Sequence, residues 1–244
     1  MNFKKAFKKF YFQKILGFRP MTVVLRHKIS PEQEKYLQSH KNFLTLQNFR
    51  NLEKNLGREI FLEIGFGGGE HVVSLAQENK ENKNLKIVGV ELYKPGVVKV
   101  LKQIDFLNLK NLFVSCDDAR DVLQKISKEN LGKIFILFPD PWTKKRQFER
   151  RLVNEKFLEK CLEKLKKNGE IIFATDWENY AQEIENILKI LEIKNKVTFE
   201  KVNNNENEKE NNFEEFTNIL NTNFAKRAKR EGRAINIFVI KKQK

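Results

Sequence analysis

Four acidic residues stand at or just beyond the ends of four short apolar runs, where their carboxylates could together hold a cationic ligand. They are Glu63, Glu91, Asp118 and Asp140. In an open α/β sheet the carboxyl ends of parallel strands lie along one edge, and ligands bind beside that edge. The spacing therefore predicts a binding site for a positively charged small molecule. Any one of these acids, Asp118 especially, could instead cap a helix.

The turn after the first of these runs narrows the choice of ligand. Its sequence is Gly65-Phe66-Gly67-Gly68-Gly69-Glu70. A dinucleotide fingerprint needs a third glycine where this chain has Glu70, and a carboxylate there would face the pyrophosphate. S-adenosyl-L-methionine carries no phosphate, and its ammonium and sulfonium groups are cationic. We therefore expect S-adenosyl-L-methionine to be the ligand, held by Glu63, Gly65, Gly67, Glu91, Asp118 and Asp140.

Three of these acids have an expected role toward that ligand. Glu63, two residues before Gly65, is the acid at a strand end that a cationic ligand favours. Glu91 ends the second strand, where the diol of a ribose needs an acceptor pair. Asp118 follows the third strand, where the amino group of an adenine needs an acceptor.

A second turn follows the apolar run Ile134–Phe138, which has the length and composition of a buried strand. The turn reads Pro139-Asp140-Pro141-Trp142, and because proline cannot donate to a sheet ladder, the strand must stop there. Asp140 is thereby held between two stiff residues. The cations after it are suited to gripping a polyanion, and they are Lys144, Lys145, Arg146, Arg150 and Arg151. The alternative is a surface turn with a solvated run of charge.

The elements that position these residues are expected to alternate. Strands are predicted over 60–64, 86–90, 112–116, 134–138, 170–174, 197–202 and 234–240, with helices after the first five. Residues 30–56 are expected to be helical, with Ser30 as the cap and Pro31 in the first turn. Five consecutive strand–helix units indicate an α/β fold, a doubly wound and mostly parallel seven-stranded sheet of the Rossmann-like type.

Positive charge is concentrated at the two ends of the chain. The formal net charge is +15, and residues 1–28 together with 224–244 account for all of it. Two basic ends on a neutral body are typical of proteins that bind a phosphate backbone, although excess lysine could simply aid solubility. We expect a basic N-terminal arm over 1–28 and one domain over 29–244, with a mobile polar loop around 203–212.

The first twenty residues leave three interpretations open. They alternate aromatic residues with the pairs Lys4-Lys5 and Lys8-Lys9, which is typical of a basic amphipathic helix. Such a segment could be an arm that grips RNA, a helix that lies on a membrane surface, or an extension upstream of a start at Met21.

The rest of the composition argues against a disulfide framework, a histidine metal site and a membrane span. Cys116 and Cys161 lie in apolar contexts without a metal-binding spacing, which predicts a reducing compartment, the cytoplasm, and no disulfide framework. The three histidines are scattered, so we expect no histidine metal site. No apolar run is long enough to span a membrane. The oligomeric state stays open between monomer and homodimer.

Taken together, the motifs resemble the bacterial tRNA (guanine-N7-)-methyltransferase family, which are class I S-adenosylmethionine-dependent enzymes. The resemblance covers roughly residues 58–240 and rests on Glu63-Ile64-Gly65-Phe66-Gly67, Gly89-Val90-Glu91, Asp118-Ala119, Phe138-Pro139-Asp140-Pro141-Trp142 through Lys144, and Ala174-Thr175-Asp176-Trp177-Glu178. It implies methyl transfer from S-adenosyl-L-methionine to N7 of a guanine in tRNA. It also implies that the four strand-end acids hold the donor, and that Lys144 and Asp176 hold the substrate guanosine.

The chemistry of that reaction agrees with the residues available. Guanine N7 offers an in-plane lone pair and carries no proton, so its methylation needs no general base, and no histidine or cysteine nucleophile is expected in the site. The product is positively charged, which makes Asp140 and Asp176 the expected catalytic residues. Trp142 or Trp177 could stack on the base or could simply pack in the core. Arg146, Arg150 and Arg151 are expected to bind phosphates of the substrate.

One motif departs from the family. The family has Thr-x-Phe/Tyr-Glu before its last strand, whereas this chain has Thr222-Asn223-Phe224-Ala225. Thr222 fits and is expected to bind substrate, but alanine replaces the glutamate, which puts one acidic contact in doubt. Asp176 could take over part of that role. Two other functions stay open: an RNA-binding protein whose donor site has lapsed, and a methyltransferase acting on an exocyclic amine.

Overall fold

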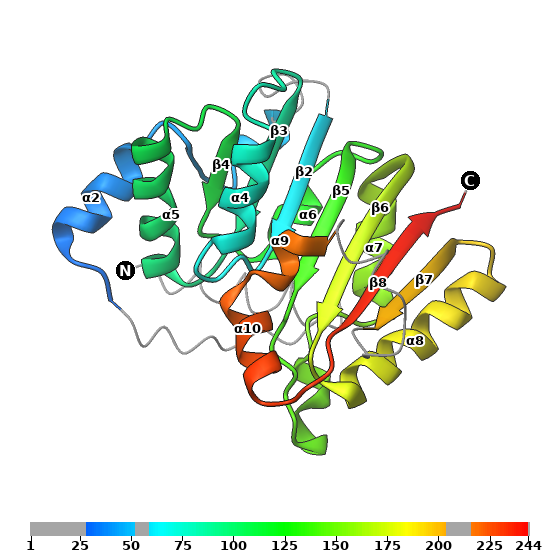
Figure 1. Cartoon of the computed structure of the whole chain (residues 1–244). Coiled ribbons are helices and arrows are strands. Elements are labelled where there is room, and N and C mark those ends of the chain that lie inside the picture. The colour runs from blue at the N-terminus through cyan, green and yellow to red at the C-terminus, as the bar shows by residue number, and fades with distance from the viewer. Residues whose placement is uncertain (1–27, 52–58, 204–215, 244) are drawn as a thin grey trace, which may run out of the picture.

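The structure is a computed structural model that describes residues 28–51, 59–203 and 216–243. Its centre is an eight-stranded sheet in the order β1-β4-β3-β2-β5-β6-β8-β7 (Figure 1). The strands are β1 (Phe43–Leu44), β2 (Glu59–Ile64), β3 (Leu85–Val90), β4 (Leu112–Ser115), β5 (Leu131–Leu137), β6 (Leu165–Thr175), β7 (Val197–Asn203) and β8 (Asn236–Lys242). All neighbours from β1 to β6 pair in parallel, and β8 lies antiparallel to both β6 and β7.

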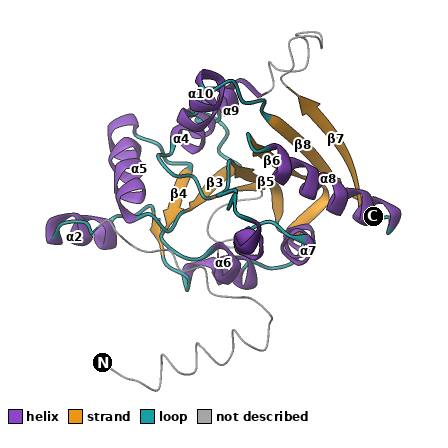
Figure 2. Ribbon diagram, turned by 90° about the horizontal axis from the view of Figure 1, so that it is seen from below, coloured by secondary structure: helices purple, strands orange, loops and turns teal. Residues whose placement is uncertain are grey.

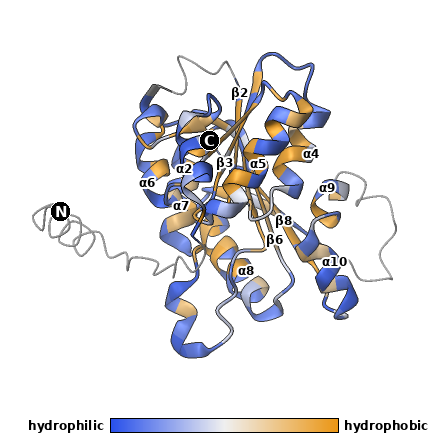
Figure 3. Cartoon of the chain, turned by 90° about the vertical axis from the view of Figure 1, so that its left-hand side faces the viewer, coloured by the Kyte–Doolittle hydropathy of each residue, from blue (hydrophilic) through white to orange (hydrophobic). Residues whose placement is uncertain are grey.

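The predicted doubly wound, mostly parallel sheet is confirmed. The helices are α2 (Pro31–Ser39), α4 (Glu70–Glu78), α5 (Lys94–Leu107), α6 (Ala119–Lys125), α7 (Glu155–Lys164), α8 (Glu178–Ile193), α9 (Thr217–Leu220) and α10 (Asn223–Arg230). Helices α4 and α5 cover one face of the sheet, and α6, α7 and α8 cover the other (Figure 2). Figure 3 shows the apolar strands enclosed by helices whose outer faces are hydrophilic.

The prediction of one helix over residues 30–56 is wrong beyond its first part. Ser30 caps α2 as expected, with Gln33 completing a capping box, but the helix ends at Ser39. The chain then forms the short strand β1 and the 3-10 helix η1 (Asn48–Asn51). Here tertiary pairing overrides helical propensity, because the Asn42 side chain donates to the Leu112 carbonyl at 2.7 Å and β1 pairs with β4. This pairing adds an eighth strand to the expected seven.

The antiparallel strand β8 decides where the last helices lie. Its residue Asn236 pairs with Thr175, the last residue of β6, so β8 starts at the edge where β6 ends. The segment just before β8 contains α10, which the sequence analysis did not predict. Because β8 runs against β6, α10 is brought to the carboxyl edge of the parallel strands (Figure 1).

The predicted N-terminal arm lies outside the described residues except for Lys28, and most of the polar loop around 203–212 lies outside them too. Among the helices that the structure describes, none has the length and apolar character needed to cross a membrane.

Candidate active site

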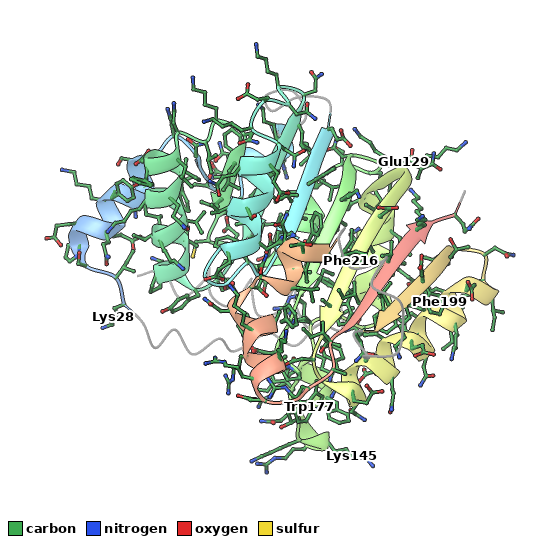
Figure 4. All side chains as sticks on the ribbon, viewed as in Figure 1. Lys28, Glu129, Lys145, Trp177, Phe199 and Phe216 are labelled. Carbon is green, nitrogen blue, oxygen red and sulfur yellow. The ribbon has the colours of Figure 1, made fainter. Side chains whose placement is uncertain are left out.

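The predicted acids come from five neighbouring strands. β4, β3, β2, β5 and β6 stand side by side and run parallel, so their carboxyl ends share one edge of the sheet. In that order, the residues at the end of each strand or shortly after it are Asp118, Glu91, Glu63, Asp140 and Asp176. In Figure 4 this edge is marked by Lys145 and Trp177, while Glu129 lies at the opposite end of the sheet.

The glycine turn after β2 is tied to the end of β3 by Glu91. The Glu91 carboxylate accepts the Gly67 amide at 2.8 Å through Oε2 and the Tyr93 amide at 2.9 Å through Oε1. Gly67 has a φ of 54° and Gly65 a φ of 78°, the left-handed region that favours glycine. A Cβ added to Gly65 would meet no atom within 4 Å, so the turn leaves open space beside the strand end. That space and the neighbouring carboxylate fit a small polar ligand.

Glu63 is buried beside a histidine that the sequence analysis dismissed. Its side chain is 3% exposed, and its Oε2 lies 2.8 Å from Nδ1 of His71, which is 4% exposed. The His71 ring packs against Phe135, with the ring centroids 4.8 Å apart. His71 is the second residue of α4, so the pair links the end of β2 to the helix that follows the glycine turn. In the sequence, this pair could have been suspected only from the eight-residue spacing of Glu63 and His71 across a strand–turn–helix unit.

Removing the imidazole should therefore destabilise the protein. We expect His71→Leu to lower the free energy of unfolding by about 1–3 kcal/mol, because it leaves a buried carboxylate without its partner. The double variant Glu63→Leu/His71→Leu should recover part of that loss, since it also removes the unpaired carboxylate. Urea unfolding measures both values. A double variant less stable than the sum of the two single variants would contradict the pairing.

Asp118 is both a helix cap and an ion-pair partner. Its Oδ1 accepts the Arg120 amide at 2.9 Å, which caps α6, and the Arg120 guanidinium also binds both carboxylate oxygens. The Asp118 carboxylate raises the pKa of the Arg120 guanidinium above its ordinary value. These bonds fix the orientation of the Asp118 carboxylate at the start of α6. Its expected contact with an adenine stays a prediction.

The turn that carries Asp140 is strained on both sides. Phe138 has a φ of 50° and Trp142 a φ of 44°, values that cost non-glycine residues roughly 1–3 kcal/mol each. The Phe138 amide donates to the Ala174 carbonyl at 2.8 Å, which holds the turn against the end of β6. Asp140 itself is exposed and makes no hydrogen bond or ion pair with any residue that the structure describes. Strained backbone and a free carboxylate are typical of a functional turn.

Arg151 is buried and bonded to protein groups. Its side chain is 1% exposed, its Nε donates to the Pro141 carbonyl at 2.8 Å, and its other nitrogens bind Glu183 and, at 3.0 Å, Asn179. The guanidinium also lies 3.9 Å from the centroid of Phe148 and 4.5 Å from that of Tyr180. Protein groups occupy the Arg151 guanidinium in this structure, so phosphate binding by this residue stays a prediction that its burial argues against. The guanidinium fixes the Pro-Asp-Pro turn onto α8.

The other cations after the turn are exposed. Lys144 precedes the 3-10 helix η2 (Lys145–Arg150), and the exposed cations of this segment are Lys144, Lys145, Arg146 and Arg150. None of them makes an ion pair with another described residue. The Arg150 guanidinium lies 5.1 Å from the centroid of the Trp142 ring. These side chains are free to meet an anion, and their binding to phosphates stays a prediction.

Asp176 is held by an arginine that the sequence analysis missed. Its Oδ2 accepts two bonds from Arg233, at 2.9 Å from Nε and 2.7 Å from the terminal nitrogen. Arg233 precedes β8, and the antiparallel pairing of β8 with β6 brings it beside Asp176. Arg233 also pairs with Glu231. The expected roles of Asp176 in catalysis and substrate binding stay predictions, now for a carboxylate of fixed orientation.

Thr222 is a helix cap rather than an open contact. Its hydroxyl accepts the Ala225 amide at 3.3 Å and donates to the Ile219 carbonyl at 2.8 Å, and the residue is 6% exposed. Substrate binding by Thr222 stays a prediction, for a hydroxyl already engaged in capping α10. Ala225 is 2% exposed and belongs to the core cluster that contains Phe138. The alanine that replaces the family's glutamate therefore seats α10 beside the Pro-Asp-Pro turn.

Neither cysteine offers a nucleophile. Cys116 follows β4, and its thiol donates to the Leu92 carbonyl at 3.6 Å. Burial raises the pKa of the Cys116 thiol to about 11, with the neighbouring Glu91 adding to the rise. The thiol is therefore protonated at neutral pH and unreactive. Burial likewise raises the pKa of the Cys161 thiol.

This sheet, with its glycine turn and a row of acids along one edge, defines a protein with the fold of class I methyltransferases. It is similar in fold to the 30S ribosomal A1408 methyltransferase from an uncultured bacterium, with a TM-score of 0.52 and 16% identity, covering 82% of this chain and 95% of that one. An antibiotic-related methyltransferase gives a TM-score of 0.50 at 18% identity, with 82% and 95% covered. The chain belongs to the methyltransferase family whose model, described as "Putative methyltransferase", matches residues 57–237.

Relatives in that family carry more specific names. A tRNA (guanine-N(7)-)-methyltransferase from Wolbachia pipientis wMel is 34% identical over 167 residues, covering 67% of this chain and 72% of the relative. The enzyme of the same name from Mannheimia succiniciproducens is 40% identical over 130 residues, covering 53% and 51%. A bifunctional methyltransferase from Rickettsia conorii is 42% identical over 129 residues, covering 53% and 24%. The chain thus spans about half the length of the Mannheimia relative and less of the Rickettsia one.

Proposed function

We propose that this protein transfers a methyl group from S-adenosyl-L-methionine to N7 of a guanine in tRNA. The observation that supports this most strongly is the row of carboxylates delivered by five adjacent strands to one edge, next to exposed cations on η2 and α10. Acids attract a cationic donor, whereas cations so close to it serve a polyanion. Relatives named tRNA (guanine-N(7)-)-methyltransferase, at 34–41% identity, support the same substrate.

The donor would lie along the glycine turn. Gly65 leaves room for it, and Glu91 is fixed by two backbone amides where it can accept from a ribose diol. Asp118, at the start of α6, is the acceptor proposed for the adenine amino group. Glu63, held by His71, adds buried negative charge near the ammonium end. Asp140 completes the set from the neighbouring strand.

The chemistry needs positioning and charge rather than proton transfer. S-adenosyl-L-methionine supplies an electrophilic methyl group on its sulfonium. The new carbon–nitrogen bond forms at the N7 lone pair as the carbon–sulfur bond breaks, and no proton leaves the guanine. The guanine gains a positive charge, which Asp140 stabilises because its carboxylate is exposed and unpaired among the described residues. Asp176, oriented by Arg233, holds the base in line.

Methylation of total tRNA with labelled donor, followed by nucleoside analysis, tests the proposal. Label in 7-methylguanosine is the expected result. Label in an N-methylated exocyclic amine would favour the second enzyme hypothesis. No label, together with no heat when S-adenosyl-L-methionine is titrated into the protein, would leave an RNA-binding protein with a lapsed donor site.

The cations of α10 should contribute to tRNA binding. Lys226, Lys229 and Arg230 are exposed and make no ion pair with another described residue. We expect Lys229→Glu/Arg230→Glu to weaken tRNA binding and to reduce the slope of log affinity against log salt by about 0.7–0.9 for each lost phosphate contact. Filter binding at several salt concentrations measures this slope.

A matched control uses two lysines at the other end of the sheet. Lys194 and Lys196 follow α8 and pair with Glu155 and Glu159. The variant Lys194→Glu/Lys196→Glu makes the same charge change and should leave the salt slope nearly unaltered. Equal losses in both variants would indicate that overall charge, rather than the α10 surface, attracts tRNA.

A further inference from the structure

An exposed phenylalanine joins the two turns of the candidate site. Phe224, the second residue of α10, is 51% exposed. Its ring stacks on Phe138 of the Pro-Asp-Pro turn, with the centroids 6.1 Å apart and the planes at 13°. The same ring also lies beside the glycine turn, because a Cβ added to Gly67 would be 3.6 Å from its Cε2 atom. One half-exposed aromatic side chain therefore stacks on the turn that carries Asp140 and lies beside the donor turn.

The position of Phe224 is rigidly supported. Thr222 caps the helix, and Ala225 and Ala228 are buried at 2% and 0% exposure, which seats α10 against the core. Asn223 donates to Glu70 of α4 at 2.8 Å, which ties the start of α10 to the helix after the glycine turn. A phenylalanine held half exposed forgoes part of the free energy that burying its apolar surface would contribute. A ligand that covers the ring would recover that free energy.

The other aromatic candidates are less available. The Trp142 ring is covered by the Arg150 guanidinium, and Trp177 packs against the main core cluster. Phe106, which is more exposed than Phe224, lies near the end of α5 that points away from the carboxyl edge. Tyr93, 42% exposed, lies at the carboxyl edge just before α5, and its ring lies against Gly96. Of these two exposed rings at the edge, Phe224 is the one that stacks on Phe138 of the Pro-Asp-Pro turn.

Nucleic-acid sites combine cations for the backbone with aromatic rings for the bases. Four cations follow Phe224 on α10, and they are Lys226, Arg227, Lys229 and Arg230. Stacking of a base on an aromatic ring contributes roughly 1–3 kcal/mol, and a base in RNA can be stacked this way once it is unpaired. Methyl transfer in line requires the base plane to be fixed relative to donor and catalytic carboxylate. A ring that stacks on one turn and lies beside the other can fix it.

We infer that Phe224 is the positioning residue on which the target guanine stacks, so that N7 faces the donor beside Asp140. This inference rests on the proposed function and specifies how its acceptor is held. It assigns a role to the family motif's aromatic position in this chain, where the adjacent glutamate is absent. Ala225 is buried and has no polar group to offer the base. We therefore expect the base to be held by stacking on Phe224, with Asp176 supplying the acidic contact.

Four substitutions separate stacking from simple packing. Phe224→Leu and Phe224→Ala should lower kcat/KM for tRNA methylation by about 10- to 100-fold, which corresponds to the loss of one stacked base. Phe224→Tyr and Phe224→Trp keep a ring and should stay within about threefold of the parent. Calorimetry with S-adenosyl-L-methionine should give the same donor affinity for all four, and thermal melts should give similar midpoints. Phe106→Leu, an exposed ring at the other edge, should change nothing.

The outcomes are distinguishable from a failure of the proposed function. If the parent protein forms 7-methylguanosine and Phe224→Leu is as active as the parent, the stacking role is overturned while the function stands. If the leucine variant loses donor affinity as much as activity, Phe224 supports the donor turn instead, and the inference is wrong. If the parent forms no 7-methylguanosine, function and inference both fall. Should Phe224→Leu melt early, retained activity in the tyrosine and tryptophan variants with loss in the leucine one still decides for stacking.

Discussion

Asp140→Asn should lower the rate of methyl transfer by about 10²- to 10³-fold, the effect expected when one group that stabilises charge in a transition state is removed. The carboxylate is exposed, and it lies between two prolines in a turn whose ends carry strained backbone. Asparagine keeps its size and removes its charge, so the electrostatic contribution is tested directly. Single-turnover methylation with saturating donor and tRNA measures the rate of the chemical step.

Binding should be affected much less than chemistry. Since no described residue bonds to Asp140, its replacement should not disturb the fold, and filter binding should give a tRNA affinity close to that of the parent. Glu129→Gln serves as a control, because Glu129 is an exposed acid at the opposite end of the sheet (Figure 4). If Asp140→Asn lost tRNA binding and turnover to the same degree, the residue would be a binding group and not a catalytic one.

Two neighbouring arginines should give opposite results. Arg151→Ala should destabilise the protein by about 3 kcal/mol, because it removes a buried guanidinium from Glu183 and Asn179 and from the Pro141 carbonyl. The value falls at the lower end for a buried pair because the Glu183 side chain stays 36% exposed. Methylation should fall with it, since the Pro-Asp-Pro turn loses its attachment to α8. Arg151→Lys should not restore stability or methylation, because lysine cannot supply the same fork of donors.

Arg150→Ala is the matched comparison. This side chain is exposed and lies over Trp142, so its loss should change stability by no more than about 0.5 kcal/mol. It should instead weaken tRNA binding and its salt dependence. Urea unfolding and salt-dependent filter binding on both variants give the four values needed. A stable Arg151→Ala protein with a reduced salt slope would restore the phosphate-binding role that its burial argues against.

Much of the fold could be predicted from the chain alone. Strand periodicity and the prolines at 139 and 141 placed β2, β3, β4, β5 and β6 to within a few residues, apart from an earlier start to β6. The parallel arrangement followed from the alternation of strands and helices, because a parallel connection needs a crossover. The short strand β1 was missed since its two residues carry no period, and only pairing with β4 makes them a strand.

The residues of the candidate site also divide into those that the sequence identified and those that only the tertiary structure revealed. Sequence by itself determined the acids at the strand ends and the glycine turn, because local patterns reveal where a parallel strand stops and what side chain stands there. Tertiary structure alone decided that Arg151 is buried while Arg150 is exposed, that His71 meets Glu63, and that Arg233 and Phe224 reach the edge. Most of these contacts join residues far apart in the chain, and Phe138 and Phe224 are 86 residues apart. The positions of Arg233 and Phe224 depend on the antiparallel pairing of β8 with β6. A local pattern carries no information on which distant side chain will occupy the space beside it.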